Sequence, residues 1–171
     1  GLGDVYKRQM WNDEPIVRIA VRDNALDIDL GRDLWQWPNM AAIWNFPRAY
    51  EGLVIEVNTT TNCERVALFH NGNEMGVRRT ADYPNHTITW CLPYRRGTLV
   101  AKGINGTDTV AVHEIRTAGD AVRLKATADR GKLMADGQDL SYVQVELLDK
   151  DGTLVQHADR HVNCLLYTSD A

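Results

Sequence analysis

Short runs of alternating apolar and polar residues, each ended by a turn signal, constrain the fold of this chain more than any other feature. Alternation with a period of two places every second side chain on one face of a β-sheet. Between residues 52 and 118 the alternating apolar positions are Leu53, Ile55 and Val57, then Val66 and Leu68, then Ile88, Trp90 and Leu92. The turn signals between these runs are Asn71-Gly72, Pro84-Asn85, Arg96-Gly97 and Asn105-Gly106. Strands at this regular spacing predict an all-β sandwich or barrel.

The pattern restarts after Thr117-Ala118-Gly119, which predicts a second β module with a boundary near Gly119. The apolar positions of the second module are Val122 and Leu124, followed by Val143, Val145 and Leu147, and a turn signal stands at Asp151-Gly152. We expect about three strands here and no strand in this sequence that covers their apolar face.

Residues 10–45 differ from the rest, because their patterning is poor and their tryptophan content is high. One strand is expected from Ile16 to Val21, and Trp35, Trp37 and Trp44 follow within ten residues. Pro38 and Pro47 disfavour helix around them. We predict an irregular connector pressed against a large neighbour outside this chain. The alternative is that the tryptophans and Tyr50 stack on sugar rings, for which they would have to be exposed on one plane.

The two ends of the chain match each other at the level of DNA. One permitted coding of DVYKRQ, residues 4–9, is GATGTGTATAAGAGACAG. Its reverse complement, read one base in, encodes CLLYTS, residues 164–169. Both ends resemble the transposon end that is used to fragment DNA for sequencing. We therefore expect residues 1–9 and 164–171 to be translated adapter sequence that takes no part in the fold, and the chain between them to be a fragment.

Composition and charge narrow the possible partners. The chain has a formal net charge of −4, 44% hydrophobic residues and 25% charged residues, which is typical of globular domains. Basic residues are not in excess, so we expect no nucleic-acid partner. No apolar run approaches membrane-spanning length, so we expect no membrane partner. Cys63 and Cys91 could pair across a sandwich, but two buried free thiols are the favoured interpretation.

Asn73-Glu74 is the strongest catalytic candidate, because glycosidases often present an acid/base carboxylate on this dipeptide. Such enzymes need two carboxylates facing each other across the sugar, on a rigid scaffold. Glu74 follows the Asn71-Gly72 hairpin signal and has no evident partner. We therefore predict a solvated hairpin tip. The NDEP segment, residues 12–15, lacks a partner in the same way. No residue is assigned as catalytic.

Two further patterns suggest metal binding and are rejected. Asp149, Asp151 and Gly152 are similar to the start of a calcium loop, but Arg160 occupies the closing position where a glutamate is required. We predict a solvated hairpin turn at this point. His157 and His161 have the spacing of one helical face, but they lie in a region expected to be strand. No metal ligand or cofactor-binding residue is therefore assigned.

Five short motifs follow one another along the chain: Thr61-Asn62, the hairpin Leu68 to Gly72, Trp90 to Tyr94, Thr117 to Gly119, and Ala135 to Leu140. In this order they resemble the carboxy-terminal β-sandwich region of glycoside hydrolase family 2, the family of β-galactosidases, β-mannosidases and β-glucuronidases. MWNDEPIV and LWQWP resemble the link that leaves the catalytic barrel of the family. The resemblance covers residues 10–163 and is weakest from 22 to 34. Arg96 departs from the pattern, since the family often has proline before that glycine.

The resemblance implies an immunoglobulin-like β-sandwich at about residues 46–118, followed by a truncated second sandwich at 119–163. It also implies that the parent is a retaining glycosidase whose catalytic barrel is missing here, so the fragment itself would be a non-catalytic accessory piece. No residue matches the nucleophile or acid/base of the family. Two rivals remain: a carbohydrate-binding module, which would expose the tryptophans to glycan, and a tandem structural sandwich of the adhesin type.

Overall fold

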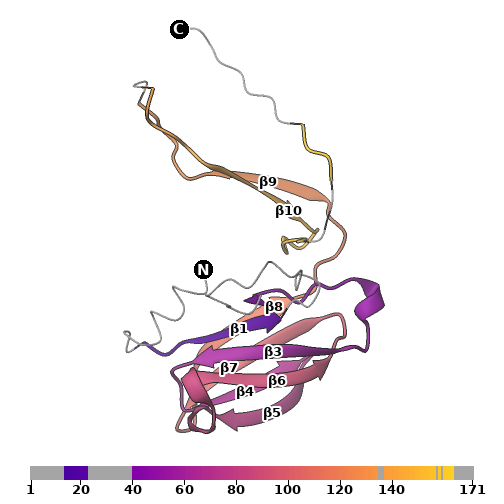
Figure 1. Ribbon diagram of the computed structural model, residues 1–171, viewed down its shortest axis with the longest axis vertical. Helices are drawn as coiled ribbons and strands as arrows, with labels where there is room; N and C mark the ends of the chain where they lie inside the picture. The colour runs from indigo at the N-terminus through magenta and orange to yellow at the C-terminus, as the bar shows by residue number, and fades with distance from the viewer. Residues whose placement is uncertain (1–13, 23–39, 135–136, 157, 159, 164–171) are drawn as a thin grey trace, which may run out of the picture. The chain divides into compact units, whose positions relative to one another are not determined.

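The computed structural model describes residues 14–22, 40–134, 137–156, 158 and 160–163 (Figure 1). These residues are all-β, with ten strands and three short 3-10 helices. The chain divides into two compact units between Thr117 and Ala118, close to the boundary predicted near Gly119. Among the described residues, no helix has the length and apolar character needed to cross a membrane.

The first sheet of the first unit has four antiparallel strands in the order β2-β1-β3-β6. Their bounds are Met40–Ala41 for β2, Val17–Arg22 for β1, Val54–Thr61 for β3 and Thr87–Pro93 for β6. The register places Val57 opposite Val21 on one side and opposite Trp90 on the other. These three buried side chains lie on the inner face of the sheet.

The second sheet has the order β5-β4-β7-β8 and is also antiparallel. The bounds are Asn73–Arg79 for β5, Arg65–His70 for β4, Thr98–Asn105 for β7 and Asp108–Arg116 for β8. The chain passes from one sheet to the other after β3, β5 and β6. This pattern of crossings is that of an immunoglobulin-like sandwich. Helix η1 (Arg48–Tyr50) precedes β3, whereas η2 (Thr80–Asp82) and η3 (Pro84–His86) connect β5 to β6.

The core lies between the two sheets and confirms most of the predicted alternation. Its largest members are Trp44, Trp90, Tyr94, Ile19, Leu68, Ile88 and Leu99, all fully buried. Ile88, Trp90 and Leu92 point inward together, while Cys91 between them is exposed. Leu53 is the exception among the predicted inward residues, because it precedes β3 and is exposed. Both described cysteines are free thiols, as predicted. The predicted burial is confirmed for Cys63 and wrong for Cys91, which is exposed.

Strand β1 belongs to the sandwich, which therefore starts near Val17 and not near residue 46 as the sequence indicated. Five residues of β1 pair with β3, from Val17 opposite Thr61 to Val21 opposite Val57. The expected strand exists, but its partner is some forty positions away in the chain. Nothing in the local pattern indicates that partner.

Trp44 is a core residue of this unit and does not face a missing neighbour. It is 0% exposed, and its indole N–H donates to the carbonyl of Arg95 at 3.0 Å. Its ring contacts Phe46, His70 and Tyr94 edge to face. The connector prediction is thus wrong for Trp44. Trp35 and Trp37 lie outside the described residues.

Two of the predicted turns hold each other in place. Asn71 and Gly72 have φ angles of 51° and 80°, the left-handed values that a type I′ hairpin turn requires. The Asn71 side chain accepts the backbone N–H of Thr98 at 2.8 Å and donates to the carbonyl of Arg96 at 3.1 Å. A Cβ at Gly97 would lie 1.8 Å from Asn71 Oδ1. The turn at residues 96–97 therefore needs glycine at its second position.

The second unit contains a two-stranded antiparallel sheet of β9 (Arg123–Ala128) and β10 (Val143–Leu148). The register gives this sheet one apolar and one polar face. The apolar face pairs Leu124 with Leu147, Ala126 with Val145 and Ala128 with Val143; the polar face pairs Lys125 with Glu146 and Thr127 with Gln144. Val143 is 58% exposed and Val145 50%. Beyond β10, the described residues add a single bridge, from Leu148 to Leu154.

Candidate functional site

Glu74 lies where the hairpin signal predicted, on the exposed β5 strand just after the Asn71-Gly72 turn. It pairs with Phe69 of β4 and makes no side-chain hydrogen bond or ion pair with the described residues. A carboxylate in this position is solvated, whereas a catalytic pair needs a second carboxylate facing it and an environment that separates the two pKa values. In NDEP, Asn12 and Asp13 lie outside the described residues, and Glu14 is exposed.

Asp149 is not solvated, which corrects the interpretation of the turn at Asp151-Gly152. Its side chain is buried and accepts three backbone N–H groups, from Gly119 at 2.8 Å, Asp151 at 2.9 Å and Thr153 at 2.8 Å. The hydrogen bond from Gly119, with those from Thr153 and Asp151, lowers the pKa of this carboxyl below its ordinary value. Asp149 therefore fixes the turn and the start of the second unit.

The described residues hold no group of three or more His, Cys, Asp or Glu side chains that could bind a metal ion. Both oxygens of Asp149 already accept backbone N–H groups. His161 is exposed and lies 2.9 Å from the side-chain oxygen of Asn163. Its proposed companion, His157, lies outside the described part of the chain.

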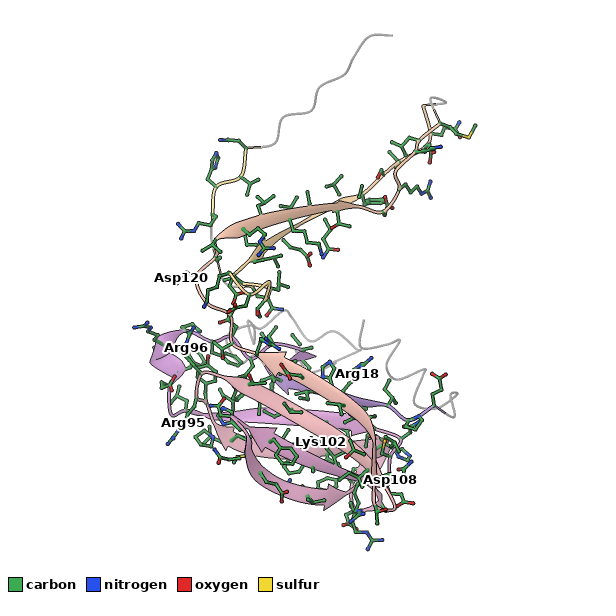
Figure 2. The ribbon with its side chains drawn as sticks, turned by 180° about the vertical axis from the view of Figure 1, so that it is seen from behind. Arg18, Arg95, Arg96, Lys102, Asp108 and Asp120 are labelled. Carbon is green, nitrogen blue, oxygen red and sulfur yellow. The ribbon has the colours of Figure 1, made fainter. Side chains whose placement is uncertain are left out.

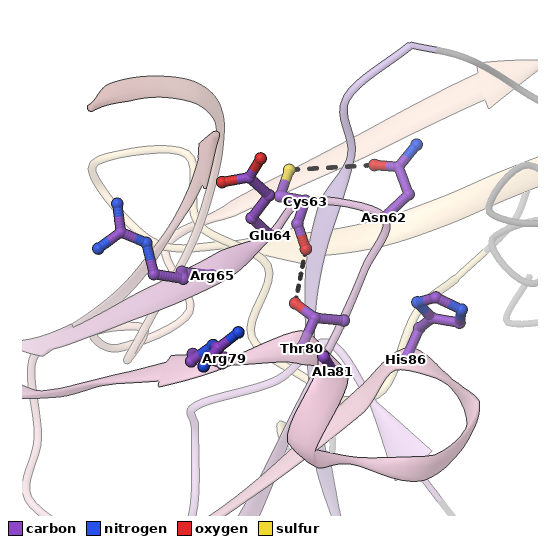
Figure 3. Close-up of a pocket in the computed structure, with 8 residues that line it drawn as sticks. All are labelled: Asn62, Cys63, Glu64, Arg65, Arg79, Thr80, Ala81 and His86. Carbon is purple, nitrogen blue, oxygen red and sulfur yellow. Dashed lines mark hydrogen bonds between the residues drawn. The ribbon is translucent and has the colours of Figure 1, made fainter. Parts of the chain in front are cut away.

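A surface pocket of about 440 Å³ lies where the β3–β4 turn meets the end of β5 and helices η2 and η3 (Figure 3). Its polar lining residues are Asn62, Glu64, Arg65, Arg79, Thr80 and His86. Cys63 and Ala81 complete the lining. The pocket is therefore built from two connections that are adjacent in space and separated in the sequence.

Four of the six polar lining residues make side-chain hydrogen bonds to the backbone, and three of these are Thr80, Asn62 and Glu64. Thr80 Oγ1 donates to the Cys63 carbonyl at 2.6 Å, and Asn62 Oδ1 accepts the backbone N–H of Ile16 at 2.7 Å. Glu64 Oε2 accepts the backbone N–H of Gly106 at 2.9 Å. Thr80, Asn62 and Glu64 thus hold the turns around the pocket together.

The other polar groups of the pocket are basic. Arg65 of β4 stands directly opposite Arg79 of β5 in the sheet register. Like charges at directly opposed positions repel each other. The Arg65 guanidinium donates to the Gly106 carbonyl. Arg79 and His86 are exposed, and their side chains make no hydrogen bond or ion pair with the described residues. Glu64 is the single carboxylate among the lining residues, so the pocket offers positive charge and N–H donors rather than a pair of carboxylates.

His113 is a half-buried residue whose contact between the two sheets the sequence analysis did not identify. It lies on β8, and its Nδ1 accepts the backbone N–H of Ile19 on β1 at 3.1 Å. Partial burial, reinforced by the positive charge of Arg18, lowers the pKa of His113 below its ordinary value of 6.5. Figure 2 shows Arg18, which lies on β1. The alternation of β8 could have predicted the inward orientation of His113, because His113 is in phase with Ala111 and Ile115, which are partly and fully buried.

Each of the two units matches a known protein-family model. The family model "Domain of unknown function (DUF4982)" matches residues 52–111, and the model "Glycoside hydrolase family 2 C-terminal domain 5" matches residues 124–167. The chain is 40% identical to β-galactosidase BoGH2A of Bacteroides ovatus over 100 residues, which are 58% of this chain. It is 32% identical to a putative β-glucuronidase of Formosa agariphila over 127 residues, 72% of this chain.

A solved structure extends the similarity to most of the chain. The crystal structure of a glycosyl hydrolase family 2 member from Bacteroides cellulosilyticus matches with a TM-score of 0.81 and 35% identity. That match covers 90% of this chain and 20% of the other chain. The chain spans 12% of the length of each of the two sequence relatives.

Proposed function

Because this chain belongs to the carboxy-terminal β-sandwich region of glycoside hydrolase family 2, we propose that it is a non-catalytic accessory part of a longer glycosidase. That enzyme would hydrolyse β-linked sugars with retention of configuration, and its catalytic barrel would be the principal partner of this region. Carbohydrate is the second proposed partner.

The observation that carries the proposal is the match of residues 124–167 to a family 2 carboxy-terminal domain, next to relatives of much greater length. A β-galactosidase and a putative β-glucuronidase share this region, which occupies 12% of each. A region of this small share, common to enzymes named for different sugars, is suited to a supporting role that does not select the sugar.

The isolation of Glu74 supports the non-catalytic assignment. A retaining glycosidase places its two carboxyl groups about 5–5.5 Å apart and holds them rigidly. Glu74 is exposed beside a two-residue turn and has no hydrogen-bond partner among the described residues. Such a side chain is free to change rotamer and is not held in a productive geometry.

The construction of the sandwich suits a rigid support. Its core contains Trp44, Trp90 and Tyr94, all nearly or fully buried, so the unit packs without help from another domain. Side chains link the two sheets at both edges of the sandwich. His113 of β8 accepts the backbone N–H of Ile19 on β1, and the Arg78 guanidinium of β5 donates to the Thr89 carbonyl on β6. A unit of this kind can hold an adjoining domain in a fixed position.

The proposal is tested by assaying the purified chain with chromogenic β-galactoside, β-mannoside and β-glucuronide substrates, with a family 2 β-galactosidase as the positive control. We expect release of chromophore at the rate of the buffer alone. The Glu74→Gln variant separates true activity from contamination. Turnover by the chain that disappears in this variant would refute the non-catalytic role.

A further inference from the structure

We propose that the pocket lined by Arg65, Arg79 and His86 binds an oxyanion group, a carboxylate or a sulfate, carried by a saccharide. The oxyanion part of this inference stands on the geometry of the pocket, and the saccharide part rests on the proposed function. Glu74 is not among the residues that line this pocket.

The first argument is that two arginines stand directly opposite each other in the sheet. Arg65 and Arg79 face each other across an antiparallel pair, where opposed residues have Cβ atoms only about 4.5–5.5 Å apart. A pair of opposite charges would stabilise these strands at this position, and a pair of like charges destabilises them. An anion bound beside the two arginines would reduce this cost.

The second argument is the supply of donors. The side-chain groups of Thr80, Asn62 and Glu64 are engaged with backbone partners around the pocket. The side chains of Arg79 and His86 line the same pocket without such a partner among the described residues. Figure 3 shows both of them at the pocket, on either side of Thr80. Guanidinium groups present a planar fork of N–H donors that matches a carboxylate or sulfate.

The third argument concerns the charge balance and size of the pocket. Its single lining carboxylate, Glu64, is already hydrogen-bonded to the Gly106 N–H, while two arginines and one histidine line the same surface. A volume of about 440 Å³ is within the range of small-molecule sites. A neutral sugar would leave the donors of Arg79 without an ionic partner.

The test is a titration of the whole ¹⁵N-labelled chain followed by NMR chemical shifts, with sodium chloride holding the ionic strength constant. The three probes are sodium glucuronate, sodium sulfate and glucose. We expect glucuronate and sulfate to shift the backbone amides of residues 62–65 and 79–86 in a saturable manner, and glucuronate to bind more tightly than sulfate. Glucose at the same concentration should leave these amides in place.

Variants assign the binding to the pocket. Arg79→Gln should weaken glucuronate binding by about two- to fivefold, the effect of removing one solvent-exposed ionic contact. The matched control is Arg48→Gln, which removes an exposed arginine of η1 outside the pocket and should leave the affinity unchanged. Equal effects of the two substitutions would overturn the proposal, because binding would then reflect net charge alone.

A charge reversal supplies a second, independent readout. Arg79→Glu replaces the opposed arginines by an Arg–Glu pair, so it should raise the melting temperature at low salt and abolish binding of both anions. Shifts of the pocket amides by glucose as large as those by glucuronate would overturn the oxyanion assignment. Binding of sulfate without glucuronate would overturn the saccharide part. Neither result bears on the hydrolysis assay, so failure of this inference is distinct from failure of the proposed function.

Discussion

His113 joins the two sheets of the sandwich at one edge, because its Nδ1 accepts the backbone N–H of Ile19 at 3.1 Å. Ile19 lies on β1 of the first sheet and His113 on β8, the edge strand of the second. At the opposite edge, Arg78 of β5 lies over the ring of Trp90 on β6, with 4.4 Å between the guanidinium carbon and the ring centroid. Side-chain contacts therefore link the two sheets at both edges of the sandwich, where no backbone hydrogen bonds join the described strands of one sheet to those of the other.

The His113 contact predicts a pH-dependent stability. An imidazole nitrogen accepts a hydrogen bond only when it is unprotonated, and burial lowers the pKa of His113 in the folded chain. Between that lowered pKa and 6.5 the unfolded chain binds more protons, so the free energy of unfolding rises with pH. The stabilisation is complete above about pH 6.5 and is lost as the pH falls below it, with a slope of at most about 1.4 kcal/mol per pH unit.

Urea titrations from pH 5 to pH 8 on the wild type and on His113→Gln measure this effect. The two proteins differ at this residue alone, so the difference between the two curves isolates His113. We expect the difference to grow as the pH rises through the range just below 6.5. Parallel curves would show that the contact with Ile19 contributes nothing to the pH dependence.

The core assignment predicts a large difference between two substitutions. Trp90 is buried between the sheets, and its indole N–H donates to Thr59 Oγ1 at 3.0 Å. Trp90→Ala should cost about 3–5 kcal/mol of unfolding free energy, the usual cost of removing a large aromatic side chain from a core. Glu74→Ala is the surface control and should change it by less than about 0.5 kcal/mol. Equal midpoint shifts in denaturant would contradict the assignment of inward and outward faces.

The contact between two turns predicts that Gly97 is irreplaceable. A Cβ at Gly97 would collide with Asn71 Oδ1, and displacing that side chain breaks its bonds to Thr98 and Arg96. Gly76→Ala is the control, since its φ of 134° is as unfavourable for alanine as the 137° of Gly97 but its Cβ meets only the Trp90 ring, at an ordinary contact distance of 3.8 Å. The control should cost about 1–3 kcal/mol for backbone conformation alone. Gly97→Ala should cost at least about 1 kcal/mol more, and equal melting temperatures would refute the clash.

The exposed apolar face of β9–β10 predicts self-association. At least half of the surface of Val143 and of Val145 is exposed there. An uncovered apolar sheet face favours contact with another molecule. Val145→Lys should lower the apparent mass measured by light scattering, whereas Gln144→Lys on the polar face should not. Hydrogen exchange should also be faster in residues 119–163 than in the first unit. A monomer with equal protection in both units would contradict this prediction.

The faces of most strands could be predicted from the sequence because they follow from local alternation. Ile88, Trp90 and Leu92 point inward and Cys91 outward as a direct result of the pleat. The Asn71-Gly72 turn could be predicted for the same reason, since the two residues alone determine its φ angles. These features depend on neighbours in the chain and not on the rest of the fold.

The position of β1 and of Trp44 could not be predicted, because both depend on distant partners. β1 pairs with residues 57–61, and Trp44 packs on Tyr94 and His70. A cluster of tryptophans has the same local signature in a core as in an interface. Asp149 was misassigned for a similar reason, since its carboxylate accepts a hydrogen bond from the N–H of Gly119, thirty residues earlier.

The basic pocket could not be predicted from the sequence, because it depends on a β-bulge. Counting outward from the Asn71-Gly72 turn, a regular hairpin would place Arg65 opposite Arg78. The register shifts between Leu68 and Phe69, so Arg65 faces Arg79 and Arg78 turns inward over Trp90. One extra residue thus separates a structural arginine from one available for binding. Neither role is visible in the Arg-Arg dipeptide itself.

Covalent trapping measures whether this region carries out any glycoside chemistry. Retaining glycosidases form a glycosyl-enzyme bond on a carboxylate. Activated 2-deoxy-2-fluoro-β-glycosides make that intermediate long-lived, so a catalytic chain gains the mass of one fluorosugar. After incubation with the galactoside, mannoside and glucuronide reagents, we expect an unchanged intact mass for this chain and a labelled positive control. A stoichiometric gain of one fluorosugar, located on a carboxylate of this chain, would show that the region is catalytic.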